Sequence, residues 1–200
     1  MEGRQRDLVK TMRGVDERPD GFTYRPAVVG VEEERSLLHV LRGLDFGPVV
    51  MHGRAARRTV RQFGYAYDFD TWQIGQTDPI PDYLIDVRAR CAELTGTDPA
   101  LFEQALVTHY PPGATIGWHR DANAFGPAVA GLSLGSDCLM RFQRRAAGGE
   151  RRVFEQPLER RSGYALTAAA RWAWQHSIPA VQQERFSITF RTLSDAADGS

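Results

Sequence analysis

The chain is poor in lysine and cysteine, and it has no long apolar run. A segment that crosses a bilayer needs roughly eighteen consecutive apolar residues, and none is present. The first residues, MEGRQRDLVKTMRG, lack the apolar stretch that is typical of a signal peptide. These absences predict a soluble, cytoplasmic protein that has no membrane partner.

The two cysteines, Cys91 and Cys138, lie among apolar neighbours in the sequence. Such a pattern is typical of buried, reduced thiols, so we expect neither a disulfide nor a cysteine metal site. The formal net charge is 0, which excludes a general basic field that would attract nucleic acid to the whole surface.

Local basic clusters are nevertheless present, and nearly all of their charge is arginine. Lys10 is the only lysine among the 25 Lys and Arg residues. The clusters fall at residues 54–61, 141–152 and 159–161. Arginine forks suit phosphate groups, but a GC-rich coding sequence explains the same bias, and both readings stay open.

A chain of 200 residues with 42% hydrophobic content is expected to form one globular domain, and we expect a monomer. Residues 1–25 and 194–200 are polar and lack periodicity, so both are predicted to be mobile. The domain is predicted to span 26–193, with helices and a surface segment in 26–100 and short strands in 101–193.

Two helices and a series of strands are predicted from periodicity and punctuation. Apolar residues recur at helical spacing in 31–44 and 81–96, and a glycine lies near the end of each segment. From about residue 102, short β-favouring runs alternate with Pro or Gly, and QRRAAGGERR at 143–152 predicts a hairpin. The expected fold class is therefore mainly β with flanking helices (α+β), built on a sandwich or jelly roll.

The stretch YPPGATIGWHRDAN at 110–123 combines a turn with two potential metal ligands. Pro112 and Gly113 suit the second and third positions of a type II turn that leads into an extended segment. Side chains alternate in an extended segment, so His119 and Asp121 share one face while Trp118 and Arg120 take the other.

A third ligand is found in RWAWQHSIP, where Trp172, Trp174 and His176 are predicted to share one face of a late strand. Two histidines and one carboxylate form a facial triad that suits non-haem Fe(II) and leaves positions for a chelating co-substrate and O₂. A zinc hydrolase uses similar ligands, and a core histidine beside two core tryptophans is the structural alternative.

The strand ERFSITFR favours the iron hypothesis because one of its faces is polar. Arg185, Ser187, Thr189 and Arg191 alternate with apolar residues, which predicts a polar front and an apolar back. A buried arginine needs an anionic partner, and its fork matches a carboxylate. The predicted anion is 2-oxoglutarate.

Together, HYPPGATIGWHRD, LSLG, WQHSI and RFSITFR resemble the AlkB-type Fe(II)/2-oxoglutarate dioxygenases, over roughly residues 57 to 193. The resemblance implies a double-stranded β-helix (jelly roll) core and the cofactors Fe(II), 2-oxoglutarate and O₂. It also implies that His119, Asp121 and His176 are catalytic iron ligands. Arg185 would pair with the distal carboxylate of 2-oxoglutarate, with Arg191 nearer its keto-acid end.

The co-substrate site resembles the family's but departs from it at one position. Ser187 lies between the two arginines, and Tyr110 resembles the tyrosine of the family's N-x-Y element. Thr108 stands where that element has asparagine, which removes one amide from the predicted co-substrate contacts. Asn123 stands where some members carry an acid that contacts the base edge, so base preference stays open.

The segment RQFGYAYDF resembles the family's substrate lid. Tyr65 and Tyr67 alternate to one face beside Arg58 and Arg61, which combines stacking surfaces with phosphate-binding charge. An ordinary aromatic strand with a solvated arginine edge is the alternative.

The function implied by the resemblance is oxidative removal of N-methyl, and by extension etheno, groups from damaged bases in DNA or RNA. The bases themselves are the implied partner. Two other hypotheses remain: the same oxygenase chemistry on transfer RNA or protein, and a non-enzymatic binding module with a structural metal.

Overall fold

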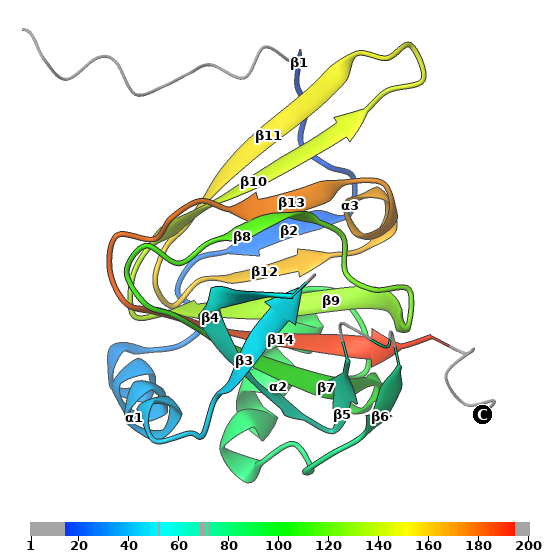
Figure 1. Ribbon diagram of the computed structural model, residues 1–200. Helices are drawn as coiled ribbons and strands as arrows, with labels where there is room; N and C mark the ends of the chain where they lie inside the picture. The colour runs from blue at the N-terminus through cyan, green and yellow to red at the C-terminus, as the bar shows by residue number, and fades with distance from the viewer. Residues whose placement is uncertain (1–14, 52, 69–70, 72, 195–200) are drawn as a thin grey trace, which may run out of the picture.

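The computed structural model describes residues 15–194 except 52, 69, 70 and 72. Two antiparallel sheets face each other, as in a jelly roll, and two helices pack below the larger sheet (Figure 1). The predicted fold class is confirmed.

The larger sheet has seven strands in the order β2-β12-β9-β14-β7-β4-β3. Its strands are β2 (Phe22–Arg25), β3 (Gly47–Met51), β4 (Arg54–Phe63), β7 (Phe102–Tyr110), β9 (Phe125–Leu134), β12 (Gly163–Leu166) and β14 (Arg185–Leu193). Because β14 lies between β9 and β7, the last long strand of the described chain is also central in the sheet.

The smaller main sheet has five strands in the order β1-β11-β10-β13-β8. These are β1 (Val15–Asp16), β8 (Ile116–His119), β10 (Cys138–Arg145), β11 (Arg151–Leu158) and β13 (Gln175–Ile178). A separate two-stranded ribbon consists of β5 (Tyr65–Tyr67) and β6 (Ile74–Gln76).

Helices cover the outer face of the seven-stranded sheet. They are α1 (Val31–Arg42) and α2 (Ile85–Glu93), which follows the 3-10 turn η1 (Asp82–Leu84). Two shorter elements lie elsewhere: the 3-10 turn η2 (Pro99–Leu101) precedes β7, and α3 (Ala168–Trp172) lies between β12 and β13 with Ala170 in an apolar core between the two sheets. One apolar core joins α1 and α2 to this sheet, with Leu41, Cys91 and Phe186 in it. None of the described helices is long and apolar enough to cross a membrane.

A second apolar core lies between the two sheets and fills only part of the space between them. It brings Phe22 and Tyr164 from the larger sheet against Phe142 and Ile178 from the smaller one. The polar face of β14 is turned into the rest of this space, while Phe186, Ile188 and Phe190 pack toward the helices. The predicted polar front and apolar back of this strand are confirmed.

The predicted hairpin is the pair β10 and β11, which extends beyond the rest of the smaller sheet (Figure 1). The predicted turn at 111–114 is also present. The amide of Ala114 donates to the carbonyl of Pro111 at 2.9 Å, and Gly113 has a φ of 81°. That angle lies in the left-handed region that glycine adopts without strain.

Two sequence-based predictions about this part of the fold are wrong. Residues 15–25, placed in a mobile segment, include β1 and β2, and β2 forms an edge of the seven-stranded sheet. Trp172 ends α3 instead of lying on the strand with His176, because the chain makes a helical turn before β13 begins. Residues 1–14 and 195–200, also predicted to be mobile, lie outside the described residues.

Candidate active site

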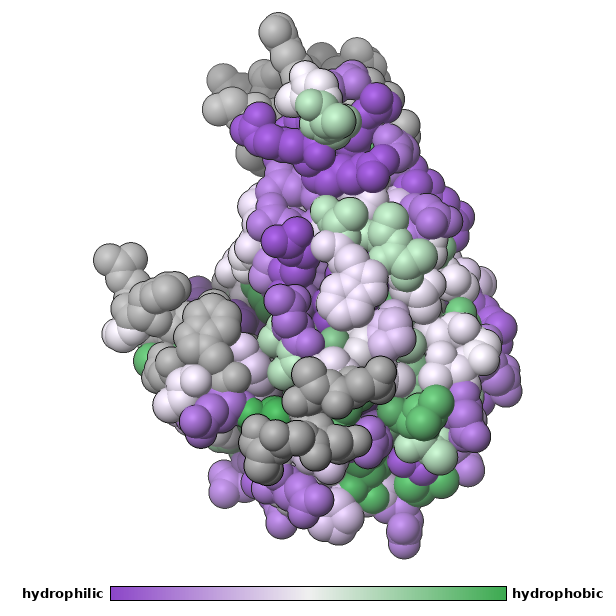
Figure 2. All heavy atoms as spheres, turned by 90° about the vertical axis from the view of Figure 1, so that its right-hand side faces the viewer, coloured by the Kyte–Doolittle hydropathy of each residue, from purple (hydrophilic) through white to green (hydrophobic). Residues whose placement is uncertain are grey.

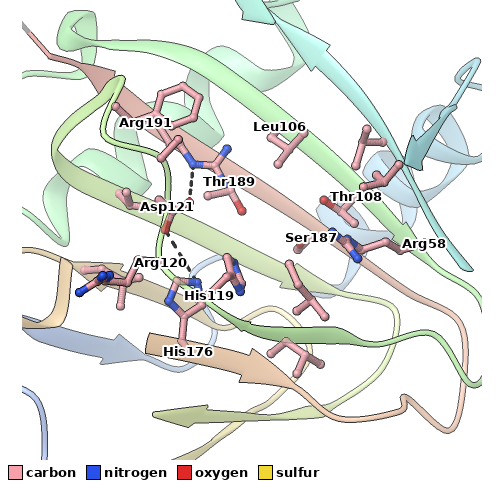
Figure 3. Close-up of a pocket in the computed structure, with 18 of the residues that line it drawn as sticks. Arg58, Leu106, Thr108, His119, Arg120, Asp121, His176, Ser187, Thr189 and Arg191 are labelled. Carbon is pink, nitrogen blue, oxygen red and sulfur yellow. Dashed lines mark hydrogen bonds and ion pairs between the residues drawn. The ribbon is translucent and has the colours of Figure 1, made fainter. Parts of the chain in front are cut away.

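A cavity of about 490 Å³ opens between the two sheets. Its walls come mainly from β4, β7, β8 and β14, with two residues each from β9, β12 and β13, one from β5 and the loop after β8. Figure 3 shows the polar side chains that point into it, arranged from Asp121 and Arg191 at one end to Ser187 and Arg58 at the other.

His119, Asp121 and His176 converge at one end of the cavity (Figure 3). His119 and His176 are directly opposite each other on β8 and β13, and their ring centroids are 4.2 Å apart. The strand β8 ends at His119, and Asp121 follows in the loop with its carboxylate Oδ2 at 3.8 Å from Nε2 of His176. The predicted common direction of His119 and Asp121 is therefore observed.

The tautomer of His119 follows from one hydrogen bond. The His119 Nδ1 atom lies 2.9 Å from the carbonyl oxygen of Gly117. A carbonyl oxygen only accepts, so Nδ1 carries the proton and Nε2 keeps its lone pair for a ligand. The Nδ1 atom of His176 is buried and has no hydrogen-bond partner within the described part of the chain.

The charges of the three side chains match those of metal ligands. Burial lowers the pKa of His176 to about 3, helped by the nearby His119, and burial also lowers the pKa of His119. Burial alone would raise the pKa of Asp121, but Arg191 and the two histidines hold it well below its usual range. Two neutral imidazoles and an ionised carboxylate are the forms that bind a divalent metal.

The three donors do not yet stand at coordination distance. Among the residues that the structure describes, no group of three His, Cys, Asp or Glu side chains could hold a metal ion as arranged. Two cis ligands of one ion at about 2.1 Å lie roughly 3 Å apart. The 3.8 Å between Asp121 and His176 must therefore shorten by about 1 Å, which small rotamer changes allow. The donor set fits iron on its chemistry and its convergence.

A chain of hydrogen bonds runs from Asp121 to the segment that contains Tyr67. Arg191 donates from Nε to Asp121 Oδ1 at 2.7 Å and from Nη1 to Gln104 Oε1 at 2.8 Å. Gln104 in turn donates to Gln62 Oε1 at 3.0 Å, and that oxygen also accepts from the backbone amide of Tyr67 at 2.8 Å. The position of Asp121 is thereby coupled to β4, β5 and β7.

Arg171 fixes the loop that carries Asp121. Its guanidinium is buried and donates to four carbonyl oxygens, those of Asp121, Ala122, Phe125 and Gly126, at 2.7 to 3.1 Å. These bonds satisfy backbone acceptors that a tight loop leaves without partners. Arg171 therefore fixes the backbone at Asp121 through these hydrogen bonds.

The opposite end of the cavity contains Arg185. Its side chain is 1% exposed, donates from Nε to Ser133 Oγ at 3.1 Å and lies over the ring of Tyr110 at 4.9 Å. Its Nη1 atom is buried without a hydrogen-bond partner, and no carboxylate of the described residues pairs with it. A buried guanidinium in this condition favours an anionic ligand.

The other predicted co-substrate residues surround this arginine. Tyr110, Thr108 and Ser187 all line the cavity, and Ser187 is the direct strand partner of Thr108. Arg58, which the sequence predicts to contact the substrate, points to the same place beside Ser187 and Thr108 (Figure 3). Burial lowers the pKa of Arg58, and its Nη1 donates to the carbonyl of Thr115 at 3.4 Å.

The predicted substrate residues divide into two groups. Tyr67 and Arg58 line the cavity, whereas Tyr65, Arg61 and Asn123 do not. Arg61 pairs with Asp78 on the opposite face of β4, and Tyr65 accepts a hydrogen bond from Gln76. Strand alternation explains the difference, because Arg58, Val60 and Gln62 share the inner face and Arg61 lies on the outer one.

Sequence reasoning missed three residues of the site, which are Gln62, Gln104 and Arg171. Gln62 and Gln104 have the same parity as the inward residues of their strands, so alternation could have found them. Arg171 had no such signal because it lies in a short helix. Trp118 lines the cavity, whereas Trp174 lies in the apolar core between the two sheets and Trp172 is 43% exposed.

The chain belongs to the 2OG-Fe(II) oxygenase superfamily, whose family model matches residues 39–191. That interval contains every cavity residue discussed above. Within the superfamily, the curated relatives that the chain resembles are ALKBH8 proteins. The superfamily's chemistry uses Fe(II), 2-oxoglutarate and O₂.

Two curated relatives match most of the chain. The tRNA (carboxymethyluridine(34)-5-O)-methyltransferase ALKBH8 of Mus musculus is 27% identical over 170 residues, covering 82% of this chain and 25% of its own length. The alkylated DNA repair protein ALKBH8 homolog of Arabidopsis thaliana is 25% identical over 181 residues, covering 80% of this chain and 51% of its own length. The chain thus spans a quarter to a half of these proteins.

Solved structures support the fold. OsALKBH1 superposes with a TM-score of 0.68 at 14% identity, covering 88% of this chain and 98% of that one. A prolyl-4-hydroxylase from Pseudomonas putida superposes with a TM-score of 0.60 at 16% identity, covering 87% and 93%. At these identities the likeness shows a shared jelly roll and nothing of substrate.

Proposed function

We propose that the protein is an oxygenase that oxidatively removes N-methyl groups, and by extension etheno bridges, from bases of DNA or RNA. The observation that carries the proposal is the cavity. It has a two-histidine, one-carboxylate set at one end and a buried guanidinium without an acid at the other. The AlkB-type relatives supply the nucleic-acid substrate class.

Each end of the cavity has a separate task in this proposal. His119, Asp121 and His176 would hold Fe(II), and Arg185, with Tyr110, Thr108 and Ser187 around it, would bind 2-oxoglutarate. With O₂ as the oxidant, the bound pair would supply oxidative decarboxylation of 2-oxoglutarate to succinate and CO₂, with one oxygen atom of O₂ entering succinate and the other a C–H bond of the N-methyl group. A hydroxymethyl group formed on a base nitrogen is then lost as formaldehyde.

The remaining residues hold Asp121 in position and enclose the cavity. Arg191 and Arg171 hold the side chain and backbone of Asp121 from two directions. Tyr67 lines the cavity and presents an aromatic face to an entering base. Leu106, Ile116 and Val129 also line the walls, which limits the water that reaches the reacting atoms.

The test is turnover on N-methylated single-stranded DNA and RNA with Fe(II) and 2-oxoglutarate. We expect equal amounts of succinate and restored base, measured by mass spectrometry, and no product from His176→Ala. Absence of both products across a panel of methylated and etheno bases would overturn the proposal.

A second candidate keeps the oxygenase and changes the product. The mouse relative's name concerns a modified uridine of transfer RNA, which makes hydroxylation of a tRNA base the alternative outcome. Competition between methylated oligonucleotides and tRNA at one stated salt concentration separates the two. The same oxygenase chemistry on protein would appear as succinate without a nucleic-acid product.

A binding module with a structural metal is the remaining alternative. It predicts that His119→Ala lowers the melting temperature. The oxygenase proposal predicts loss of turnover with an unchanged melting temperature, because His119 lies at a cavity wall and outside both apolar cores.

A further inference from the structure

The outer face of the five-stranded sheet begins at the cavity mouth. Trp118 and Arg120 are among the residues that line the cavity, and strand alternation places their side chains on the opposite face of the chain from His119. The guanidinium of Arg141, two strands away on β10, lies 5.1 Å from the ring of Trp118. The face therefore connects the mouth directly with the hairpin.

The hairpin continues this face with an excess of positive charge. By register, the outward positions are Arg141, Gln143 and Arg145 on β10, opposite Glu155, Val153 and Arg151 on β11. Three arginines thus share six positions with one carboxylate, which lies 3.6 Å from Arg141. Figure 2 shows hydrophilic residues concentrated at the end of the molecule that the hairpin forms.

The inward-facing residue pairs of β10 and β11 show how the fold neutralises two arginines that lie opposite each other. Arg144 and Arg152 are direct cross-strand partners, as Arg145 and Arg151 are. Glu17 from the chain next to β1 contacts both Arg144 and Arg152 and so bridges that pair. Like charges directly opposite in a sheet oppose folding unless an anion lies between them. On the outward side, Arg151 donates to Gln143 Oε1, and Arg145 is exposed and forms no ion pair with a carboxylate of the described residues.

Aromatic surface accompanies the charge near the mouth. Trp172 is 43% exposed and lies against the guanidinium of Arg171 at 4.0 Å. Arg120, which lines the cavity, donates to the backbone carbonyl of Trp172 at 3.4 Å, so it contacts the end of α3. Exposed rings beside arginines suit stacked bases and phosphates of a single strand.

We propose that this outer face, from Trp172 and Arg120 at the mouth to Arg145 and Arg151 on the hairpin, binds the backbone of single-stranded nucleic acid that flanks the reacting base. The surface rests on the proposed function for its ligand class. It adds a strand-binding site on the five-stranded sheet, separate from Tyr67 and Arg58 inside the cavity. Charge complementarity and continuity with the cavity mouth carry the inference.

The first test measures binding of an unmodified, fluorescein-labelled 15-nucleotide strand by anisotropy. The double variant Arg145→Gln/Arg151→Gln is expected to bind about tenfold more weakly, because two phosphate contacts are lost. Its slope of log K against log salt is expected to fall by about 1.4, since each single-strand phosphate contact contributes roughly 0.7.

The matched control is Arg25→Gln/Arg35→Gln, which removes the same charge from exposed arginines on β2 and α1. It is expected to bind like the wild type. Equal weakening in both double variants, or no weakening in the hairpin variant, overturns the proposal. A larger loss on duplex than on single strand overturns its single-strand assignment.

A second variant tests the aromatic part independently. Trp172→Ala is expected to weaken binding of the 15-mer about fivefold, and Trp172→Phe, which keeps a stacking ring, to restore most of it. Equal binding by all three proteins overturns the role of this ring.

Turnover separates this surface from the proposed function. On a methylated 15-mer the hairpin variant should lose kcat/KM about tenfold, and on a methylated trinucleotide it should match the wild type. If the wild type turns over neither substrate but binds through the hairpin, only the proposed dealkylation fails. If it turns over both and the hairpin variant does so equally well, only the surface fails.

Discussion

The two arginines near the ends of β14 have the same side chain and opposite surroundings. Arg191 donates to Asp121 and Gln104, so its charge and two of its donors are satisfied within the chain. Arg185 meets a hydroxyl and a tyrosine ring, and its Nη1 has no partner in the described structure. β14 thus carries two buried guanidinium groups: the charge of Arg191 is paired within the chain (a complete charge), and the charge of Arg185 is not (an incomplete charge).

The difference separates residues that stabilise the structure of the site from a residue whose charge can bind the co-substrate. Arg171 with its four carbonyls, and Glu34 with Arg160, Arg161 and the amide of Gly135, are complete in the way that Arg191 is. Removal of a complete charge should change the free energy of unfolding or the geometry of Asp121. The incomplete charge of Arg185 should affect co-substrate affinity alone.

The largest effect is expected from Arg171→Met. The shorter, uncharged side chain leaves four buried carbonyl oxygens without donors, which should lower the free energy of unfolding by about 3–4 kcal/mol. Urea denaturation measures this loss. Arg171→Lys, which keeps the charge and fewer donors, should lie between the two proteins. An unchanged free energy of unfolding in Arg171→Met would show that the loop at Asp121 keeps its conformation without these hydrogen bonds.

Arg185→Gln tests the incomplete charge. Losing the fork to a carboxylate should raise KM for 2-oxoglutarate about 100-fold, or about 2.7 kcal/mol. The melting temperature should not fall, because no acid is left unpaired. The comparison breaks if KM stays constant while the protein is destabilised. Arg185→Lys, with one point charge, should recover part of the affinity.

Arg191→Gln tests a complete charge beside the ligands. Removing a neighbour that orients a metal ligand typically lowers metal affinity 10- to 100-fold. We expect that range for Co²⁺, followed by calorimetry, with KM for 2-oxoglutarate changed less than in Arg185→Gln. An equal change of KM for 2-oxoglutarate in both variants would show that Arg185 and Arg191 do not differ in their contribution to co-substrate binding. Gln104→Leu, one bond further away, should lower Co²⁺ affinity by about threefold.

The smallest effect on the cavity is expected at Glu34, which lies far from it. Burial alone would raise the pKa of its carboxyl, but hydrogen bonds from Arg160, Gly135 and Arg161 lower it below the ordinary value of 4.5. Because the folded pKa lies below the unfolded one, this stabilisation is present above about pH 4.5 and disappears as pH falls through the folded pKa.

Glu34→Gln should therefore lower the free energy of unfolding by about 1–2 kcal/mol at pH 7 and leave it nearly unchanged at low pH. Denaturation at pH 7 and at pH 3 measures both values. Turnover per folded molecule should equal that of the wild type. A pH-independent loss would mean that packing, rather than charge, accounts for Glu34.

The sequence alone determined the features that depend on period and local turn chemistry. Alternation along β14 placed Arg185, Ser187, Thr189 and Arg191 on one face, and the structure turns that face into the cavity. The turn at Pro112 and Gly113, both main helices and the β10–β11 hairpin were likewise predicted, because each depends on residues close together in the chain.

Only the tertiary structure decided which of these faces meet. The hydrogen-bond chain from Tyr67 through Gln62, Gln104 and Arg191 joins segments from four strands, and Arg171 reaches its carbonyls across 45 to 50 residues. The inward turn of Arg58 beside Thr108, and the place of β2 in the sheet, depend equally on packing. Periodicity states which side of a strand a residue occupies, whereas partners across a cavity are set by how two sheets pack.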